Sequence, residues 1–420
     1  MNKFLNYITS ELLLSLVFLN YIFYFILDTK FFFAYFSFII LLVFSIILIN
    51  NVKINFYIVL VIVILSFISL GSPVADWDSR SIWLFNAKRI FYNLTLKEFT
   101  SYYGSEFSHV DYPILVQTLS ASLATLIGHW NEIFPKFSNV IMALPALLMF
   151  TNIIKSNLSK LALLLLVFFI YEKSLINGDM DALLSLYTCA SLILLIEYSH
   201  LKELNIKHIT KMFLYFTTLT MIKIEGIGIL GCLLFSYIFI NYKDNLKINF
   251  KIVLTFLISF TPIILWKFYI LDKNVISSSS LMISGGERFF ENLVNFKFLL
   301  ALFKGIFLNK QMFIAMIIFL LSISKYISLN KKTIQISINK ILVKKKALFT
   351  IITLSTYFIL LLLIFISSEG SLTNVQEIQF SMAKTAADRL FLPIHSMLIL
   401  CAIYLIEEKK FNYEDKLKKN

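Results

Sequence analysis

Long apolar runs alternate with short polar connections along almost the whole chain. A hydrocarbon core of about 30 Å takes about 20 apolar residues per helical span. Backbone amides in lipid must be satisfied within their own segment, so such runs indicate helices, whereas a closed barrel would show short alternating segments. The pattern predicts an all-α integral membrane protein, a polytopic bundle of about twelve transmembrane helices. The predicted spans are 11–27, 32–49, 55–71, 136–153, 160–172, 181–199, 209–222, 226–240, 252–270, 311–328, 348–366 and 389–406.

Composition excludes two other classes of protein. Of the 420 residues, 59% are hydrophobic and 15% are charged, which leaves too few polar groups to cover a soluble globular surface. Eleven glycines and six prolines are too few for a fibrous or disordered chain. Cys189, Cys232 and Cys401 all lie in apolar spans and indicate neither a disulfide framework nor a metal site.

The net charge of +13 is concentrated in the connections 200–211, 241–251 and 329–347. Excess lysine and arginine marks the cytoplasmic side of a membrane protein, so this placement favours topology control over nucleic-acid binding. Both termini are then cytoplasmic. The apolar stretch 113–128 would reverse this assignment if it crossed the bilayer. Because it is short and begins with Pro113, we expect a juxtamembrane or re-entrant helix.

This topology places three long loops outside, where loops of such length are commonly functional. They are 72–112, 271–310, with an amphipathic helix expected at 287–304, and 367–388. The predicted parts of the chain are an N-terminal two-helix membrane extension (1–54), a main transmembrane domain (55–406) and a cytoplasmic tail (407–420).

The first candidate site is the segment 75–91, directly after the third predicted span. Asp76 and Asp78 precede an amphipathic helix that carries Arg80 and Lys88 within reach of lipid phosphates. Capping by Asp78 explains one of the two acids but not both, which favours a functional role. We expect the apolar side chains to face the membrane and the tryptophans to lie at the headgroups: Ile82, Phe85, Ile90, Trp77 and Trp83.

The second candidate site is the segment 109–115, HVDYPIL. His109 and Asp111 can form a general-base pair or contribute metal ligands, with Tyr112 beside them. Ordinary capping of a helix that starts at Pro113 is an equal alternative.

The third candidate site lies at the outer end of the sixth predicted span, NGDMDALLSLY. Asp179 and Asp181 diverge by about 200° on a helix, so both face one site only if a turn precedes the helix. Asn177–Gly178 supplies such a turn. Capping is the expected role of Asp179, whereas Asp181 requires a polar cavity.

The last two candidate sites are a turn and the outer end of the final span. Lys223 and Glu225 interrupt a long apolar run, and Gly226 permits the chain to reverse; a plain polar hairpin is the alternative. Arg389 carries a fork suited to phosphate, or else extends to lipid headgroups. His395 lies deeper and is expected to be a packed interior residue.

In their order along the chain, these segments resemble motifs of the GT-C superfamily of polyprenyl-phosphate-sugar-dependent glycosyltransferases. The resemblance is to the bacterial branch related to protein O-mannosyltransferases and lipid A aminoarabinose transferases. It covers roughly 55–406, with 1–54 as two added helices and no soluble C-terminal domain after it. The similar segments are Trp77–Asp78, His109–Pro113, Gly178–Asp181, Lys223–Gly226 and Asp388–Pro393.

The resemblance implies a GT-C-like catalytic domain in the bacterial inner (plasma) membrane, with its active site outside. A sugar passes with inversion from a polyprenyl phosphate donor to a hydroxyl of a glycan, lipid or protein acceptor. Asp78, or second to it Asp76, is the implied general base. Arg389 and Lys223, with Lys88 or Arg89 as alternatives, are the implied cations for the departing phosphate. The other implied substrate-binding residues are Arg80, His109, Asp111, Tyr112, Asp179, Asp181 and Glu225.

A divalent metal remains open, because only some members of the superfamily use one. Asp76, Asp78 and either Asp179 or Asp181 could hold Mg²⁺ or Mn²⁺.

Two rivals come from other classes of protein. A lipid or solute transporter or flippase places ionisable residues or broken helices near the middle of the membrane, often in two related halves, and the sequence shows neither. A membrane scaffold gives no reason for acids to collect outside. An enzyme requires the outer acids to converge on one site, whereas a scaffold lets them scatter.

Overall fold

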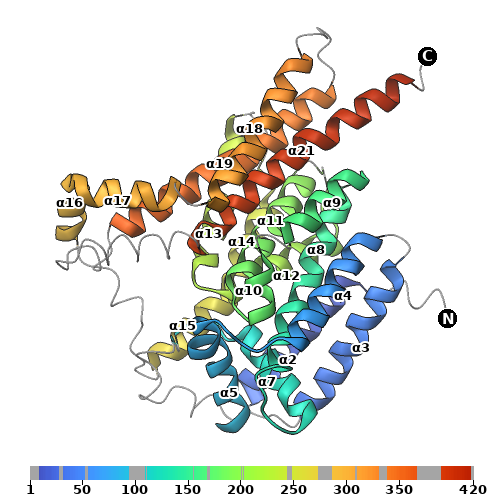
Figure 1. The fold of residues 1–420 in the computed structure, drawn as a ribbon, viewed down its shortest axis with the longest axis vertical. Helices are drawn as coiled ribbons and strands as arrows, with labels where there is room; N and C mark the ends of the chain where they lie inside the picture. The colour runs from blue at the N-terminus through green and yellow to red at the C-terminus, as the bar shows by residue number, and fades with distance from the viewer. Residues whose placement is uncertain are drawn as a thin grey trace.

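The computed structural model of the chain is helical throughout its regular elements, as predicted (Figure 1). The structure describes residues 9–27, 32–52, 55–93, 109, 111–154, 156–167, 171–199, 201, 203–243, 248–272, 286–307, 310–330, 338–366 and 389–417. No strand occurs among these residues.

The first part of the chain forms the blue and blue-green side of the bundle in Figure 1. Its elements are α2 (Ser10–Leu27), α3 (Phe33–Asn51), α4 (Phe56–Gly71), a π-helical turn η1 (Ser79–Trp83), α5 (Leu84–Asn93), α7 (Leu115–Ile127), a 3-10 turn η3 (Pro135–Phe137) and α8 (Ser138–Ile153). The later helices are α9 (Asn157–Leu166), α10 (Glu172–Asn177), α11 (Asp181–Tyr198), α12 (Ile206–Ile222), α13 (Glu225–Lys243), α14 (Phe250–Ser259), α15 (Thr261–Asp272), α16 (Gly286–Val294), α17 (Phe296–Phe307), α18 (Lys310–Asn330), α19 (Ile338–Ile366) and α21 (Leu392–Leu417).

Five helical segments within the described ranges are long and apolar enough to cross a bilayer. They are Phe33–Asn51, Asp181–Tyr198, Glu225–Tyr242, Phe250–Asp272 and Lys346–Ile364. Shorter apolar helices occupy several of the other predicted spans. The larger number of about twelve spans stays a prediction.

Two predicted spans are not single regular helices. In 160–172, α9 ends at Leu166 and α10 begins at Glu172. In 252–270, α14 gives way to α15 beside Pro262, whose ring nitrogen cannot donate a helical hydrogen bond. Mean hydropathy does not distinguish such runs from one continuous helix.

Helix α7 corresponds to the apolar stretch 113–128. Its 13 residues span about 20 Å, less than the hydrocarbon core of about 30 Å, which fits a helix that does not cross the bilayer. It begins at Leu115, two residues after the expected start at Pro113. Nearly all of its side chains are buried, and Ser120 Oγ lies 2.7 Å from Ser138 Oγ of α8.

Helices α2 and α3 pack against α7 and the start of α8. Ser122 Oγ of α7 donates a hydrogen bond to Asn20 Oδ1 of α2 over 3.0 Å, and Phe44 of α3 meets Phe137 edge to face. The predicted extension 1–54 is therefore not set apart in space from the rest of the bundle.

Helix α11 occupies the middle of the bundle, with almost all of its side chains buried. It packs against α8, α12 and α21. Tyr187 Oη donates a hydrogen bond to the backbone oxygen of Met142 in α8 over 3.0 Å. This bond gives the phenol hydroxyl an acceptor, which lipid tails could not provide. Because α11 begins at Asp181 and lies beside α21, the N-terminal end of α11 meets the segment just before α21.

Helices α16 and α17 form an arm that projects from the bundle (Figure 1). Their apolar side chains, including Phe296, Leu300 and Phe303, are exposed, with Lys304 beside them. This arm contains the amphipathic helix expected at 287–304.

Candidate functional site

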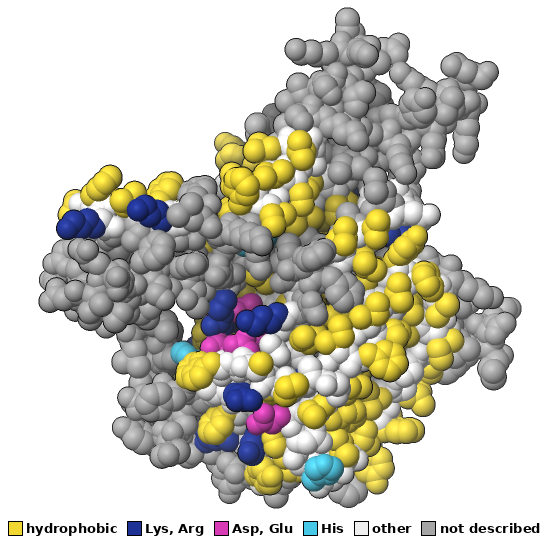
Figure 2. Space-filling view, viewed as in Figure 1, with side chains coloured by type: hydrophobic (Ala, Val, Ile, Leu, Met, Phe, Trp, Pro, Cys, Tyr) yellow, Lys and Arg dark blue, Asp and Glu magenta, His cyan; other side chains and the backbone are white. Residues whose placement is uncertain are grey.

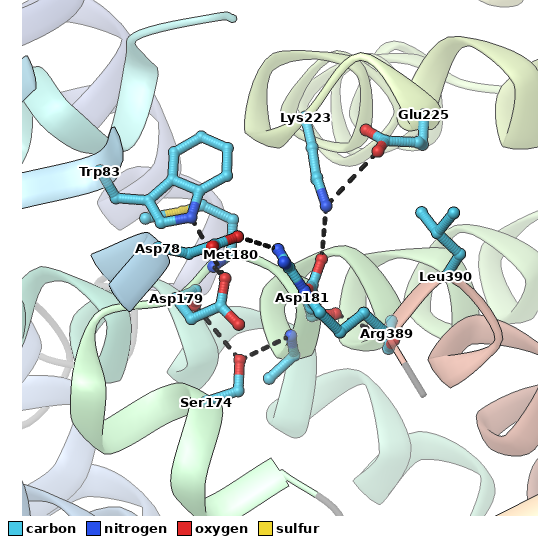
Figure 3. A network of polar contacts seen from close by, with 12 residues as sticks. Asp78, Trp83, Ser174, Asp179, Met180, Asp181, Lys223, Glu225, Arg389 and Leu390 are labelled. Atoms are coloured by element: carbon cyan, nitrogen blue, oxygen red, sulfur yellow. Dashed lines mark hydrogen bonds and ion pairs between the residues drawn. The ribbon is translucent and has the colours of Figure 1, made fainter. Parts of the chain in front are cut away.

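Acidic and basic side chains from segments far apart in sequence meet at the ends of several helices (Figure 3). Each of these residues lies at or just beyond a helix end, which explains why the helices bring them together rather than burying them along their length. Figure 2 shows acidic and basic groups side by side in one patch, with apolar side chains next to it. We call the following set the acid–base cluster: Asp78, Asp179, Asp181, Lys223, Glu225 and Arg389.

Arg389 joins two of the acids. Its Nη2 forms an ion pair with Asp78 Oδ2, and its Nε donates to Asp181 Oδ2 over 2.7 Å. The planar guanidinium has a fixed fork of donors, which allows one side chain to bridge two carboxylates. Capping of the following helix was the alternative role for Asp78, but its side chain makes no capping hydrogen bond and pairs with Arg389 instead.

Lys223 is the second cation and is only 4% exposed. Its Nζ lies 2.6 Å from Asp181 Oδ1 and 3.4 Å from Glu225 Oε1. Burial lowers the pKa of Lys223, but Asp181 and Glu225 outweigh burial and hold the pKa well above its ordinary value. The lysine therefore stays charged, and the predicted hairpin is part of the cluster.

The turn after α12 needs a glycine for a reason that the sequence did not indicate. Gly226 lies in the first turn of α13, and a Cβ there would come within 2.0 Å of the backbone oxygen of Leu219. Close approach of α12 and α13, rather than freedom to reverse the chain, requires the glycine.

Asp179 is held in the turn that precedes α11. Its Oδ1 accepts hydrogen bonds from Trp83 Nε1 over 3.2 Å and from the backbone N–H of Met180 over 2.6 Å. Burial, reinforced by the charge of Asp181, raises the pKa of Asp179 to about 7. The expected capping role belongs instead to Ser174, whose Oγ accepts from the Ala182 backbone N–H over 3.1 Å.

Gly178 makes the turn that lets both acids face the cluster. Its φ is +87°, which is a left-handed conformation that suits glycine. The sequence predicted that both acids could face one site only if a turn preceded the helix. This is confirmed, because Asp179 lies in the turn and Asp181 is the first residue of α11.

An aromatic stack connects the segment at 109–112 to Asp179. The ring of His109 stacks on Tyr112 with centroids 5.0 Å apart, and Tyr112 stacks on Trp83 at 5.4 Å. His109 has a left-handed φ of 48°, which is rare outside glycine and marks local strain. Burial lowers the pKa of His109, although Asp111 and Asp78 oppose that shift.

Asp111 belongs to a second, neighbouring contact. Its carboxylate Oδ2 lies 3.5 Å from Lys267 Nζ, and its backbone oxygen accepts from Trp266 Nε1 over 3.0 Å. Both partners come from α15. The segment 109–112 is thus fixed to α15 on one side and to Trp83 on the other.

Several predicted site residues are not in the acid–base cluster. The side chains of Arg80 and Lys88 are exposed, and neither takes part in an ion pair among the residues that the structure describes. Asp76 is half-buried near Asp179, without a side-chain partner in the described ranges. Asp388 lies outside the described residues.

The amphipathic helix after Asp78 faces the protein rather than lipid. Ile82 and Ile90 are buried, and Trp83, expected at the headgroups, is fully inside the bundle. Trp77 is exposed, as a headgroup position requires. A side chain that suits lipid also suits a protein core, so hydrophobic periodicity alone did not separate the two.

Lys136 is a buried residue that was not among the candidate site residues predicted from the sequence. Its Nζ donates to the backbone oxygen of Ser72 over 2.5 Å and to Ser72 Oγ over 3.1 Å, at the C-terminal end of α4. A Cβ at Gly178 would lie 3.1 Å from Lys136 Cβ. Lys136 therefore contacts the segment that leads to Asp78 and the turn that holds Asp179. A lone lysine at the start of an apolar run was the available signal, as was Lys267 within the predicted span 252–270.

Two cations already pair with acids of the acid–base cluster. The described part of the chain holds no group of three or more histidine, cysteine, aspartate or glutamate side chains suited to a metal. Arg389 forms ion pairs with Asp78 and Asp181, and Lys223 with Asp181, and these positive charges would repel a metal ion.

Comparison with protein-family models gives no match for the chain, and neither a curated protein nor a solved structure matches it. The functional conclusion rests on the geometry of the acid–base cluster and the chemistry of its residues.

Proposed function

We propose that the protein is a membrane glycosyltransferase that moves a sugar from a polyprenyl phosphate donor to an acceptor hydroxyl at the outer face of the plasma membrane. The observation that carries the proposal is the composition of the acid–base cluster. It combines two fixed cations with carboxylate oxygens that have no partner among the described residues, namely Asp78 Oδ1, Asp179 Oδ2 and Glu225 Oε2. Phosphate requires cations, whereas hydroxyl groups require hydrogen-bond acceptors, and a lipid-linked sugar presents both.

The cations are suited to the phosphate. Arg389 presents its guanidinium fork from the segment before α21, with its side chain 34% exposed, and Lys223 presents an ammonium group from the turn after α12. As the bond between the anomeric carbon and the phosphate oxygen breaks, negative charge develops on the departing polyprenyl phosphate. Preorganised cations stabilise that charge more in the transition state than in the ground state.

Asp78 is suited to act as the general base. One of its oxygens pairs with Arg389, and the other accepts no hydrogen bond from the described residues. The free oxygen takes the proton of the acceptor hydroxyl as that hydroxyl attacks the anomeric carbon, and polyprenyl phosphate leaves from the opposite side with inversion. General-base assistance of this kind contributes about 10²–10⁴ in rate.

Arg389 couples these two roles because it holds Asp78 before the donor arrives. A donor phosphate competes for the same guanidinium, so its binding weakens the ion pair between Arg389 and Asp78. The base is then released when the donor is in place.

The test is to incubate the purified protein with a panel of polyprenyl phosphate sugars and measure the release of free polyprenyl phosphate. Asp78→Asn is isosteric and should abolish release while the protein remains folded. Asp76→Asn is the matched control, because that side chain has no ion-pair partner in the described ranges, and it should retain most activity. Wild-type turnover in Asp78→Asn would contradict the assigned base, and movement of intact donor across the membrane without cleavage would favour a flippase.

A further inference from the structure

Asp179 differs from the other acids of the acid–base cluster in the kind of partner it has. Each of the others lies within 4.0 Å of a lysine or arginine nitrogen. Asp179 receives only uncharged donors, from Trp83 Nε1 and the Met180 backbone, and both bond to Oδ1. Its second oxygen, Oδ2, has no partner among the residues that the structure describes, although the residue is only 5% exposed.

Oδ2 is not one of the fully enclosed, unpartnered side-chain oxygens of the described residues, so a hydrogen-bonding group can reach it. Oδ1 already accepts two hydrogen bonds, so a further partner would approach Oδ2. Figure 3 shows the carboxyl group beside Asp78 and Arg389, within the cluster that the proposed function assigns to the donor.

We propose that Asp179 Oδ2 binds a hydroxyl group of the donor sugar, an assignment that rests on the proposed glycosyl transfer. A hydroxyl both donates and accepts hydrogen bonds, so it matches a carboxyl oxygen in either protonation state. A phosphate oxygen carries no proton to donate and would be repelled by a carboxylate. The donor is thus divided between two parts of the cluster, with its phosphate on Arg389 and Lys223 and its sugar on Asp179.

The carboxyl group is held rigidly enough to select among sugars. The Trp83 indole that bonds Oδ1 stacks on Tyr112 with centroids 5.4 Å apart. The backbone oxygen of Asp179 accepts hydrogen bonds from Asn139 Nδ2 over 2.6 Å and from Ser174 Oγ over 3.4 Å. A fixed acceptor rewards a hydroxyl in one position and configuration, because a displaced hydroxyl leaves Oδ2 unpaired.

The experiment compares two ligands that differ only in the sugar: polyprenyl phosphate carrying one hexose, and the same polyprenyl phosphate without it. For Asp179→Ala, we expect the dissociation constant of the hexose-linked lipid to rise about 10- to 100-fold. Binding of the sugar-free lipid should change by no more than about twofold, because its phosphate does not reach Asp179. Arg389→Ala is the matched control and should weaken binding of both lipids.

Asp179→Asn provides a second variant in case the alanine variant does not fold, since its amide oxygen still accepts from Trp83 and Met180. It should lose affinity for the hexose-linked lipid selectively, by a smaller factor. An equal loss for both lipids, or no loss for either, would overturn the sugar-binding role while leaving the proposed function intact. If the folded wild-type protein binds neither lipid, both proposals fail.

Discussion

Arg389 Nε and Asp181 Oδ2 lie 2.7 Å apart, although 208 residues separate them along the chain. The same guanidinium also pairs with Asp78, which lies before η1, so one side chain ties together three distant segments. Because Asp181 is almost fully buried and opens α11, this contact fixes the last described helix to the centre of the bundle.

Replacing Arg389 should impair the binding of an anionic lipid donor. Arg389→Lys keeps the charge but cannot bridge two carboxylates, and we expect about tenfold weaker donor binding. Arg389→Ala should weaken binding about 100-fold. Equilibrium binding of a labelled polyprenyl phosphate sugar measures both effects. Arg80→Ala is the control, because Arg80 is exposed and outside the acid–base cluster; equal effects at Arg80 and Arg389 would contradict the assignment.

Lys223→Met should destabilise the protein. It removes a buried cation from Asp181, which is 3% exposed, and leaves that carboxylate with only Arg389. Breaking a buried ion pair from one side costs about 3–5 kcal/mol, and we expect the lower end because one partner remains. Thermal unfolding in detergent tests this expectation. The double variant Lys223→Met, Asp181→Asn should recover part of the loss, and an unchanged double variant would argue against the pair as the cause.

The free energy of unfolding should decrease as the pH rises from about 4 to about 7, because of the titration of Asp179. The pKa of Asp179 is raised to about 7 in the folded protein, against an ordinary value near 4. In this window the folded state keeps a proton that the unfolded chain has released, so the native state is favoured at the acid end. Asp179→Asn should flatten this dependence. Melting curves across the window for both proteins give the comparison, and parallel curves would show that another group is responsible.

Lys136 should act as a positioning residue. Lys136→Met leaves the backbone oxygen of Ser72 unpaired, at a cost of about 1–3 kcal/mol. We expect kcat to fall about tenfold at an unchanged donor KM, because Asp78 is displaced rather than removed. Lys136→Arg should restore part of kcat. Lys88→Met is the matched control at an exposed lysine, and a folded Lys136→Met protein with normal kcat would limit the residue to a role in stability.

Gly226→Ala should be the most damaging glycine substitution in α13. The new Cβ would collide with the Leu219 backbone oxygen, and separating α12 from α13 should cost about 3 kcal/mol or more. Gly231→Ala in the same helix meets no atom within 4 Å and should be neutral or slightly stabilising. Expression yield and melting temperature of the two variants test the difference, and equal behaviour would contradict the close-approach explanation.

The sequence indicated that charged residues would gather at one end of the bundle, because lipid excludes charge from the interior of a span. The structure brings together four of these charged residues, as predicted: Asp78, Asp181, Lys223 and Arg389. Which of them pair could not be predicted from the sequence, because the pairing depends on α21 lying beside α11. Hydropathy does not predict which helices of a bundle are neighbours.

Other features were hidden for different physical reasons. Trp83 and Ile90 have the periodicity of a lipid-facing helix, but a protein interior accepts the same side chains. Lys136 stands alone at the start of an apolar run, and nothing near it in sequence reveals Ser72 as its acceptor.

The position of Arg389 so late in the chain has a consequence for biogenesis. Asp78, Asp181 and Lys223 all precede Arg389 in the chain, so the segments that carry them can pack before their shared arginine has been synthesised. Until Arg389 packs beside α11, Lys223 is the one cation of the acid–base cluster, and the ion pairs that join Asp78 and Asp181 to residue 389 cannot form.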